Sequence, residues 1–130
     1  MANVKAHIGT KKFRTELTTA TNTLISDEPV DLGGEDLGFS PGELLASSLA
    51  SCTAATLRMY ADHKQWPLEE VKIEVTFTRD TKTNSASFTK IIEFFGDLDE
   101  KQIARLTSVA SACPIHKVLT GTITIDTEIR

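Results

Sequence analysis

The chain has 130 residues, of which 40% are hydrophobic and 25% charged, and its formal net charge is −4. These totals are typical of a globular protein, and we expect a single domain spanning residues 1–130. The acidic balance, without a run of like charges, argues against a nucleic-acid surface, which needs clustered Lys and Arg. The N-terminal stretch MANVKAHIGTKK lacks the apolar region of a signal peptide, and no apolar run approaches the ~18 residues of a membrane-spanning helix. We therefore expect a cytoplasmic protein whose partners are small molecules or proteins, with no membrane association.

The first part of the chain is rich in short apolar and β-branched runs. Residues 3–26 predict two or three antiparallel strands, with breaks at residues 9–10 and 20–22. Residues 27–41, DEPVDLGGEDLGFSP, contain two prolines and three glycines and are expected to form a loop that leads into a helix. The pair Gly33-Gly34 favours a turn that needs positive φ over a close approach of backbone to a ligand.

Residues 40–66 are expected to form one long helix with Cys52 in its middle. The SPGE sequence predicts a capping box, in which Ser40 and Glu43 bond each other's backbone amides and proline occupies the first helical position. The helix is expected to end near Trp66, because the following residue is a proline. The predicted buried stripe consists of Leu45, Leu49, Cys52, Thr56 and Met59. Spacings of three and four put these residues on one face, so the thiol is expected to point inward.

The rest of the chain predicts a hairpin, a second helix and a last strand. Residues 71–77 alternate apolar and polar side chains and are expected to pair with residues 88–95. Asp97 and Glu100 predict a second capping box. The predicted inward face of the helix that follows consists of Ile103, Leu106, Ala110 and Cys113. Pro114 interrupts it, a short helical turn follows and is expected to end at Gly121, and TITIDTEI alternates as a strand.

Together these elements predict an α+β fold. An antiparallel sheet packs on the long central helix bearing Cys52 and on a second helix ending at Cys113. Both thiols lie on faces that must cover the same core. They are therefore expected to approach within the Cα separation of ~7 Å that a disulfide requires.

Each of the two cysteines is open to several interpretations. Taken alone, each is most often a small buried hydrophobe. Cys113 precedes Pro114 and is expected to cap the next turn, where free amides and the helix dipole favour a thiolate. Cys52 lies well inside its helix, so its activation needs a neighbouring cation or hydrogen-bond donor. Local electrostatics thus point to Cys113 as the thiol with the lower pKa.

Other candidate groups have a structural alternative. A zinc site could combine Cys113 and His116 with Cys52 and either His63 or His7, but no second clustered ligand pair supports it, and we expect no metal and no other cofactor.

The carboxylate and the cation that a reactive thiol needs also have candidates. Glu43 is a candidate general base and also the third residue of a capping box, which is the favoured interpretation. Arg14 and Arg58 are candidate cations, although Arg58 lies off the helical face of Cys52.

The stretches GGEDLGFSPGELLASSLASCTAATLRMYA and SACPIHKVLTG resemble the OsmC/Ohr family of cysteine-based peroxidases. The resemblance covers the chain from about residue 10 to its end, and it is strongest to a less characterised OsmC-like branch. It implies an intertwined homodimer that reduces organic hydroperoxides. By this resemblance Cys52 attacks the peroxide, Cys113 resolves the sulfenic acid as a disulfide, Arg14 and Glu43 assist, and a dithiol such as dihydrolipoamide regenerates the thiols.

Two positions depart from the family pattern. The glutamate that commonly follows the helix-start proline is replaced by Gly42, and Glu43 stands one residue later, which rotates its side chain by ~100° on a helix. Arg14 is the sole arginine before the helix, and its surrounding sequence does not match the family motif closely. The alternative function is therefore an OsmC-like ligand-binding or redox-sensing protein with little peroxidase turnover.

Overall fold

The computed structural model describes all of residues 1–130, and the chain forms two compact units, residues 1–45 and residues 46–130. The single domain spanning residues 1–130 stays a prediction. No helix in either unit combines the length and apolar character needed to cross a membrane.

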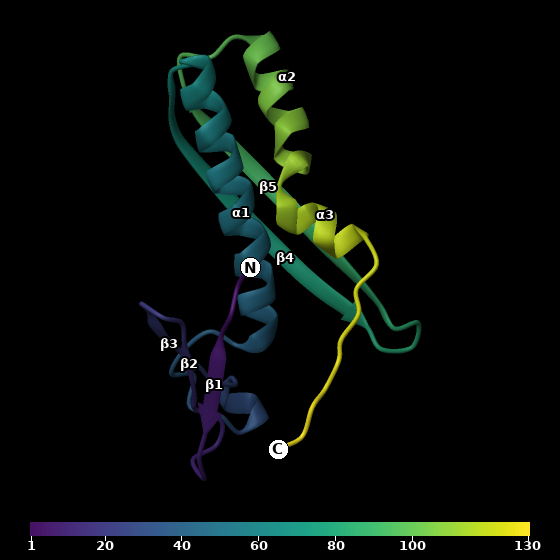
Figure 1. The fold of residues 1–130 in the computed structure, drawn as a ribbon. Helices are drawn as coiled ribbons and strands as arrows, with labels where there is room; N and C mark the ends of the chain where they lie inside the picture. Colours follow the sequence, from purple (N-terminus) through teal and green to yellow (C-terminus); the bar gives the residue numbers. More distant parts are fainter. The chain divides into compact units, whose positions relative to one another are not determined.

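The first unit contains a three-stranded antiparallel sheet (Figure 1). Its strands are β1 (Lys5–Ile8), β2 (Thr15–Thr18) and β3 (Thr23–Ser26), with β2 in the centre. Leu17 lies opposite Leu24 in the register of β2 and β3. The prediction of antiparallel strands in residues 3–26 is therefore confirmed, with all three strands formed.

A buried carboxylate organises the loop that follows β3. Asp27 is 1% exposed and accepts backbone hydrogen bonds at 2.8–3.2 Å from Phe13, Glu28, Glu35 and Leu37. Burial raises the pKa of this carboxyl, but the four amides outweigh burial and lower the pKa overall. The loop also holds a 3₁₀ turn, η1 (Val30–Leu32), which ends at Gly33 with φ of 92°, so the predicted turn is confirmed.

The long helix α1 spans Pro41–Lys64, and its predicted start is confirmed. The Ser40 amide donates to the Glu43 carboxylate at 2.8 Å, and the Glu43 amide donates to the Ser40 hydroxyl at 3.2 Å. The helix ends two residues before Trp66, because Gln65 adopts a left-handed conformation with φ of 57°. The Trp66 amide then reaches back to the Ala61 carbonyl at 2.9 Å, as in a Schellman motif.

The buried face of α1 differs from the predicted stripe. Its buried residues are Leu49, Thr53, Leu57 and Ala61. Met59 is 69% exposed and Leu45 38% exposed, so the prediction for these two residues is wrong. These four buried residues are spaced four apart and form one row along the helix, which faces the core. Cys52 directly precedes Thr53 and is half-buried at the edge of that face.

The second unit is built on a long hairpin. Strand β4 (Leu68–Asp80) pairs antiparallel with β5 (Ser85–Gly96), and the Phe77 and Phe88 rings stack across it with centroids 4.9 Å apart. The predicted hairpin is confirmed, and both strands are longer than predicted.

The second helix, α2, spans Glu100–Val109 and begins later than predicted. Its capping box is Asp99 with Gln102, not Asp97 with Glu100, because the Asp99 carboxylate accepts the Gln102 amide at 2.8 Å. Ile103 is 41% exposed, so its predicted inward position is also wrong.

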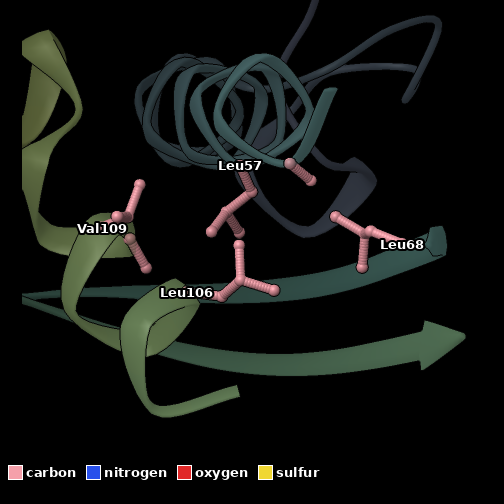
Figure 2. Close-up of a cluster of buried hydrophobic side chains, with 6 residues drawn as sticks. Leu57, Leu68, Leu106 and Val109 are labelled. Carbon is pink, nitrogen blue, oxygen red and sulfur yellow. The ribbon is translucent and has the colours of Figure 1, made fainter. Parts of the chain in front are cut away.

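Both helices contribute to one hydrophobic core over the hairpin. Figure 2 shows Leu57 of α1 beside Leu106 and Val109 of α2, with Leu68 of β4 close by. Ala61 and Ala110 complete the fully buried cluster, against which Val71, Ile73, Ile92 and Phe94 of the hairpin pack. The antiparallel sheets and three helices confirm the predicted α+β class.

The chain after α2 runs through a short 3₁₀ helix, η2 (Ala110–Ala112), into α3 (Pro114–Thr120), which ends at Gly121. The predicted final strand over TITIDTEI does not form. In this segment Ile123, Ile125 and Ile129 are 56%, 87% and 88% exposed. The segment has the alternating pattern of a strand, but no strand of this chain pairs with it, so its backbone has no partner for the hydrogen bonds of a sheet.

Candidate functional site

Both cysteines lie in the second unit. Cys52 lies on α1 and is half-buried, whereas Cys113 lies between η2 and α3 and is 0% exposed. Both are free cysteines, and the Cys52 thiol is one of the groups that lower the pKa of Cys113. The Cα separation that a disulfide requires stays a prediction.

Cys113 is the N-cap of α3, as its position before Pro114 predicts. Its sulfur accepts the His116 amide at 3.2 Å and faces the Thr53 hydroxyl at 3.7 Å. Burial raises the pKa of the Cys113 thiol. This effect is outweighed by four groups that lower the pKa, which are the His116 amide, the Thr53 hydroxyl, the Cys52 thiol and the Lys90 ammonium. The net shift of the Cys113 pKa is downward, in the direction that the N-cap position predicts.

Lys90 is a residue of the site that the sequence analysis missed. Its ammonium donates to the Ala110 carbonyl at 2.9 Å and to the Thr53 hydroxyl oxygen at 3.2 Å, and it lies 3.3 Å from Nδ1 of His116. A lysine ammonium has three donors and no acceptor, so in a hydrogen bond between them Nδ1 of His116 can only accept. A signal was present in the sequence: Lys90 stands in phase with the inward-facing Phe88 and Ile92.

Thr53 connects the lysine to the thiol. Its side chain is 0% exposed, and its hydroxyl also donates to the Leu49 carbonyl at 2.8 Å, one turn earlier in α1. A hydroxyl has a single proton, which here has two acceptors, the Leu49 carbonyl and the Cys113 sulfur. A negative charge on the sulfur would draw that proton toward it.

An open groove of about 440 Å³ is formed by residues of α1 and α2 and by Ala112 of η2, and neither cysteine lines it. It is mostly apolar and is lined by Thr56, Met59, Tyr60, His63, Arg105, Val109 and Ala112. Thr56 is one helical turn after Cys52, and Ala112 directly precedes Cys113. The Arg105 guanidinium donates to the Tyr60 hydroxyl at 2.8 Å, which fixes the polar rim of the groove.

Arg14 and Glu43 belong to the first unit. Arg14 is exposed and directly precedes β2, next to Phe13, whose amide is held by the Asp27 carboxylate at 3.2 Å. Hydrogen bonds from the Ser40 amide and hydroxyl lower the pKa of the Glu43 carboxyl, so Glu43 is an ionised capping residue. The catalytic roles of Arg14 and Glu43 stay predictions.

The candidate cation Arg58 has a structural role, and the candidate zinc ligands do not form a cluster. Arg58 donates to the Leu68 carbonyl at 2.7 Å and to the Asp62 carboxylate at 3.1 Å, which ties α1 to the start of β4. No group of three or more His, Cys, Asp or Glu side chains is placed to hold a metal ion.

Comparisons with known proteins agree with this architecture. The sequence model of the family described as OsmC-like protein matches residues 33–128. A crystal structure of a protein from Psychrobacter arcticus 273-4, named for an osmotic stress induced and detoxification response, is 30% identical, with 91% of this chain and 88% of that chain covered and a TM-score of 0.79.

Two further solved structures are similar in fold. An OsmC-like protein from Mycoplasma pneumoniae is 22% identical over 93% of this chain and 88% of that chain, with a TM-score of 0.80. An organic hydroperoxide resistance protein OsmC from Legionella pneumophila is 25% identical over 93% of this chain and 90% of that chain, with a TM-score of 0.69. No curated protein matches the sequence. Because the family match spans most of its length, the chain belongs to the OsmC-like protein family.

Proposed function

We propose that the protein is a thiol-dependent peroxidase that reduces organic hydroperoxides, with Cys52 as the attacking thiol and Cys113 as the resolving thiol. The observation that carries the proposal is the pair of free cysteines, of which the Cys113 sulfur accepts the His116 amide and faces the Thr53 hydroxyl, two groups that stabilise a negative charge. The Legionella pneumophila protein, named for organic hydroperoxide resistance, supports the substrate class.

Accessibility supports this assignment of the two roles. A hydroperoxide cannot reach the Cys113 sulfur, which is 0% exposed, whereas Cys52 is half-buried. Attack requires the thiolate form of Cys52, because a thiolate and not a thiol is the nucleophile.

The reaction then balances in two steps. The Cys52 thiolate attacks the distal oxygen of the hydroperoxide, the O–O bond breaks, and the departing alkoxide takes the proton of the Cys113 thiol and leaves as an alcohol, so that Cys113 becomes a thiolate. Cys52 is now a sulfenic acid. The Cys113 thiolate attacks its sulfur, hydroxide leaves and is protonated to water, and a disulfide remains. A dithiol of the dihydrolipoamide type restores both thiols by exchange.

The apolar groove fits an organic rather than an inorganic peroxide. Of its lining residues, Ala112 directly precedes Cys113 in sequence, Thr56 follows Cys52 by one helical turn, and Met59 contributes an exposed apolar side chain. An alkyl or aryl group bound there loses contact with water, which favours binding in proportion to the apolar area covered. Hydrogen peroxide has no such group and gains nothing from the groove.

The auxiliary residues, the assembly and the compartment are also part of the proposal. Arg14 is proposed as the cation and Glu43 as the carboxylate that assist Cys52, although the Glu43 carboxylate already serves the helix cap. We propose a homodimer, because residues 122–129 expose alternating isoleucines that need a strand to pair with. The reducing cytoplasm would keep the two cysteines free between turnovers.

The test uses the two thiols asymmetrically. Cys52→Ser should abolish consumption of cumene hydroperoxide, because a serine hydroxyl is barely ionised near neutral pH. Cys113→Ser should consume about one equivalent per chain and then stop, because the sulfenic acid cannot be resolved. Wild type should form a disulfide between residues 52 and 113 that a dithiol reverses, as seen by mass spectrometry. If Cys113→Ser instead loses the first turnover, the roles are reversed.

The second candidate function is a binding or redox-sensing protein with little turnover. The replacement of the usual glutamate by Gly42 favours it, together with the capping role of Glu43. Wild type that consumes no more peroxide than the double cysteine variant would support this candidate and refute the peroxidase.

A further inference from the structure

Lys90 occupies a position on β5 where the strand pattern calls for an apolar side chain. It lies in phase with the half-buried Phe88, Ile92 and Phe94, and opposite Val75 of β4. An ammonium in such surroundings is costly unless each of its donors is satisfied and a negative charge lies nearby. The first condition is met by the Ala110 carbonyl, the Thr53 hydroxyl and the His116 ring.

The second condition points to the thiols. None of the three acceptors of Lys90 is a carboxylate, and the ion pairs of the structure are Lys11 with Glu35 and Arg58 with Asp62. Lys90 therefore has no carboxylate partner. The ionisable acid beside it is the Cys113 thiol, on which the Lys90 charge acts.

The contacts of Lys90 also converge on one sulfur. Thr53 presents its hydroxyl to the Cys113 sulfur at 3.7 Å, and the backbone amide of His116 donates to the same sulfur at 3.2 Å. Lys90 bonds the side chains of both residues, which come from α1 and α3. A single ammonium thus bonds the Thr53 hydroxyl that faces the sulfur and the ring of His116, whose backbone amide donates to the same sulfur.

We propose that Lys90 is a positioning residue of the thiol site, which holds the Thr53 hydroxyl beside the Cys113 sulfur, anchors α3 through the His116 ring, and supplies the positive charge that balances the Cys113 thiolate. Its effect on turnover rests on the proposed peroxidase function, whereas its effect on the ionisation of Cys113 does not. A lysine that only joins β5 to the helices would contribute to stability and leave the ionisation of the thiol unchanged.

The test separates these two roles with a single remaining sulfur. In the Cys52→Ser protein, ionisation of Cys113 is followed by thiolate absorbance at 240 nm as the pH is raised. Lys90→Met should move the midpoint to higher pH, and Lys90→Arg, which keeps the charge, should move it back toward the parent. The matched control is Lys72→Met, since Lys72 is exposed on the same hairpin and its ammonium lies over the Phe95 ring at 5.3 Å.

The outcomes are distinct. Coincident midpoints for Lys90→Met and Lys72→Met in folded protein, as judged by circular dichroism, would overturn the proposal. If Lys90→Met does not fold, Lys90→Gln is titrated in its place, because it keeps a donor and lacks the charge; its midpoint must also rise.

Turnover gives a second measurement in the protein with both cysteines. Lys90→Met should slow the first turnover of cumene hydroperoxide at pH 7 about tenfold, the loss of thiolate expected when one opposite charge is removed, and the rate should recover at higher pH. A rate that stays at the wild-type value would count against Lys90. Should wild type itself consume no peroxide, the peroxidase proposal fails, while the titration of Cys113 still decides the role of Lys90.

Discussion

Replacing Thr53 by valine tests whether the contacts around Cys113 act as one network. The change keeps the β-branched shape and removes one buried hydroxyl, which accepts from Lys90 at 3.2 Å and faces the Cys113 sulfur at 3.7 Å. One donor of the Lys90 ammonium then lacks a partner inside the protein. Leaving such a group unsatisfied costs about 1–3 kcal/mol of unfolding free energy. The pKa of Cys113 should rise, because one of its stabilising hydrogen bonds is lost.

A closely matched control exists on the second helix. Thr107 donates to the Ile103 carbonyl at 2.8 Å, as Thr53 does to the Leu49 carbonyl at 2.8 Å, but Thr107 is exposed. Thr107→Val should therefore change the unfolding free energy by no more than about 0.5 kcal/mol. Urea unfolding measures the stability, and the pH dependence of thiolate absorbance measures the site. Equal stabilities and equal thiol titrations for the two valine variants would refute the network.

Three further predictions concern other parts of the chain. Asp27→Asn should destabilise the protein at pH 7. Because the folded-state pKa of Asp27 is lowered, its ionised carboxylate stabilises the folded protein above its ordinary pKa of ~3.9, and this stabilisation is lost as the pH falls through the folded-state pKa. Urea unfolding at pH 7 and pH 3 should therefore show that the difference in unfolding free energy between Asp27→Asn and wild type shrinks in acid. Gly42→Glu restores the family's usual glutamate and should raise the rate of cumene hydroperoxide consumption, and an unchanged rate would mean that this position does not limit turnover. Sedimentation should give twice the chain mass of 14.2 kDa, and removal of residues 122–130 should yield monomer; a stable wild-type monomer at micromolar concentration would rule out the dimer.

Local rules placed most elements of the fold correctly. The capping box at Ser40 and the N-cap at Cys113 depend on side chains within a few residues of the helix start, so the sequence shows them directly. The start of α2 was misplaced because Asp97 and Asp99 both stand three residues before a possible capping partner. The capping pattern alone does not distinguish the two registers, and the structure has the one that begins at Asp99.

Features set by distant partners could not be predicted in the same way. The stripe through Cys52 was displaced by one residue, since the side of a helix that faces a sheet depends on the sheet, and the predicted final strand lacks a partner within the chain. Lys90 was missed because its three acceptors lie 20, 26 and 37 residues away in sequence. An alternating strand reveals a lysine on its inward face, but not the groups that the lysine meets.

The arrangement of the two thiols has a consequence for the proposed reaction cycle. The groups that stabilise a negative charge surround the buried Cys113 sulfur rather than the accessible Cys52. Resolution should therefore be favoured, since the sulfur that attacks the sulfenic acid of Cys52 is the one whose thiolate form is stabilised. A second peroxide must compete with that intramolecular attack, so the site should favour disulfide formation over irreversible oxidation of Cys52.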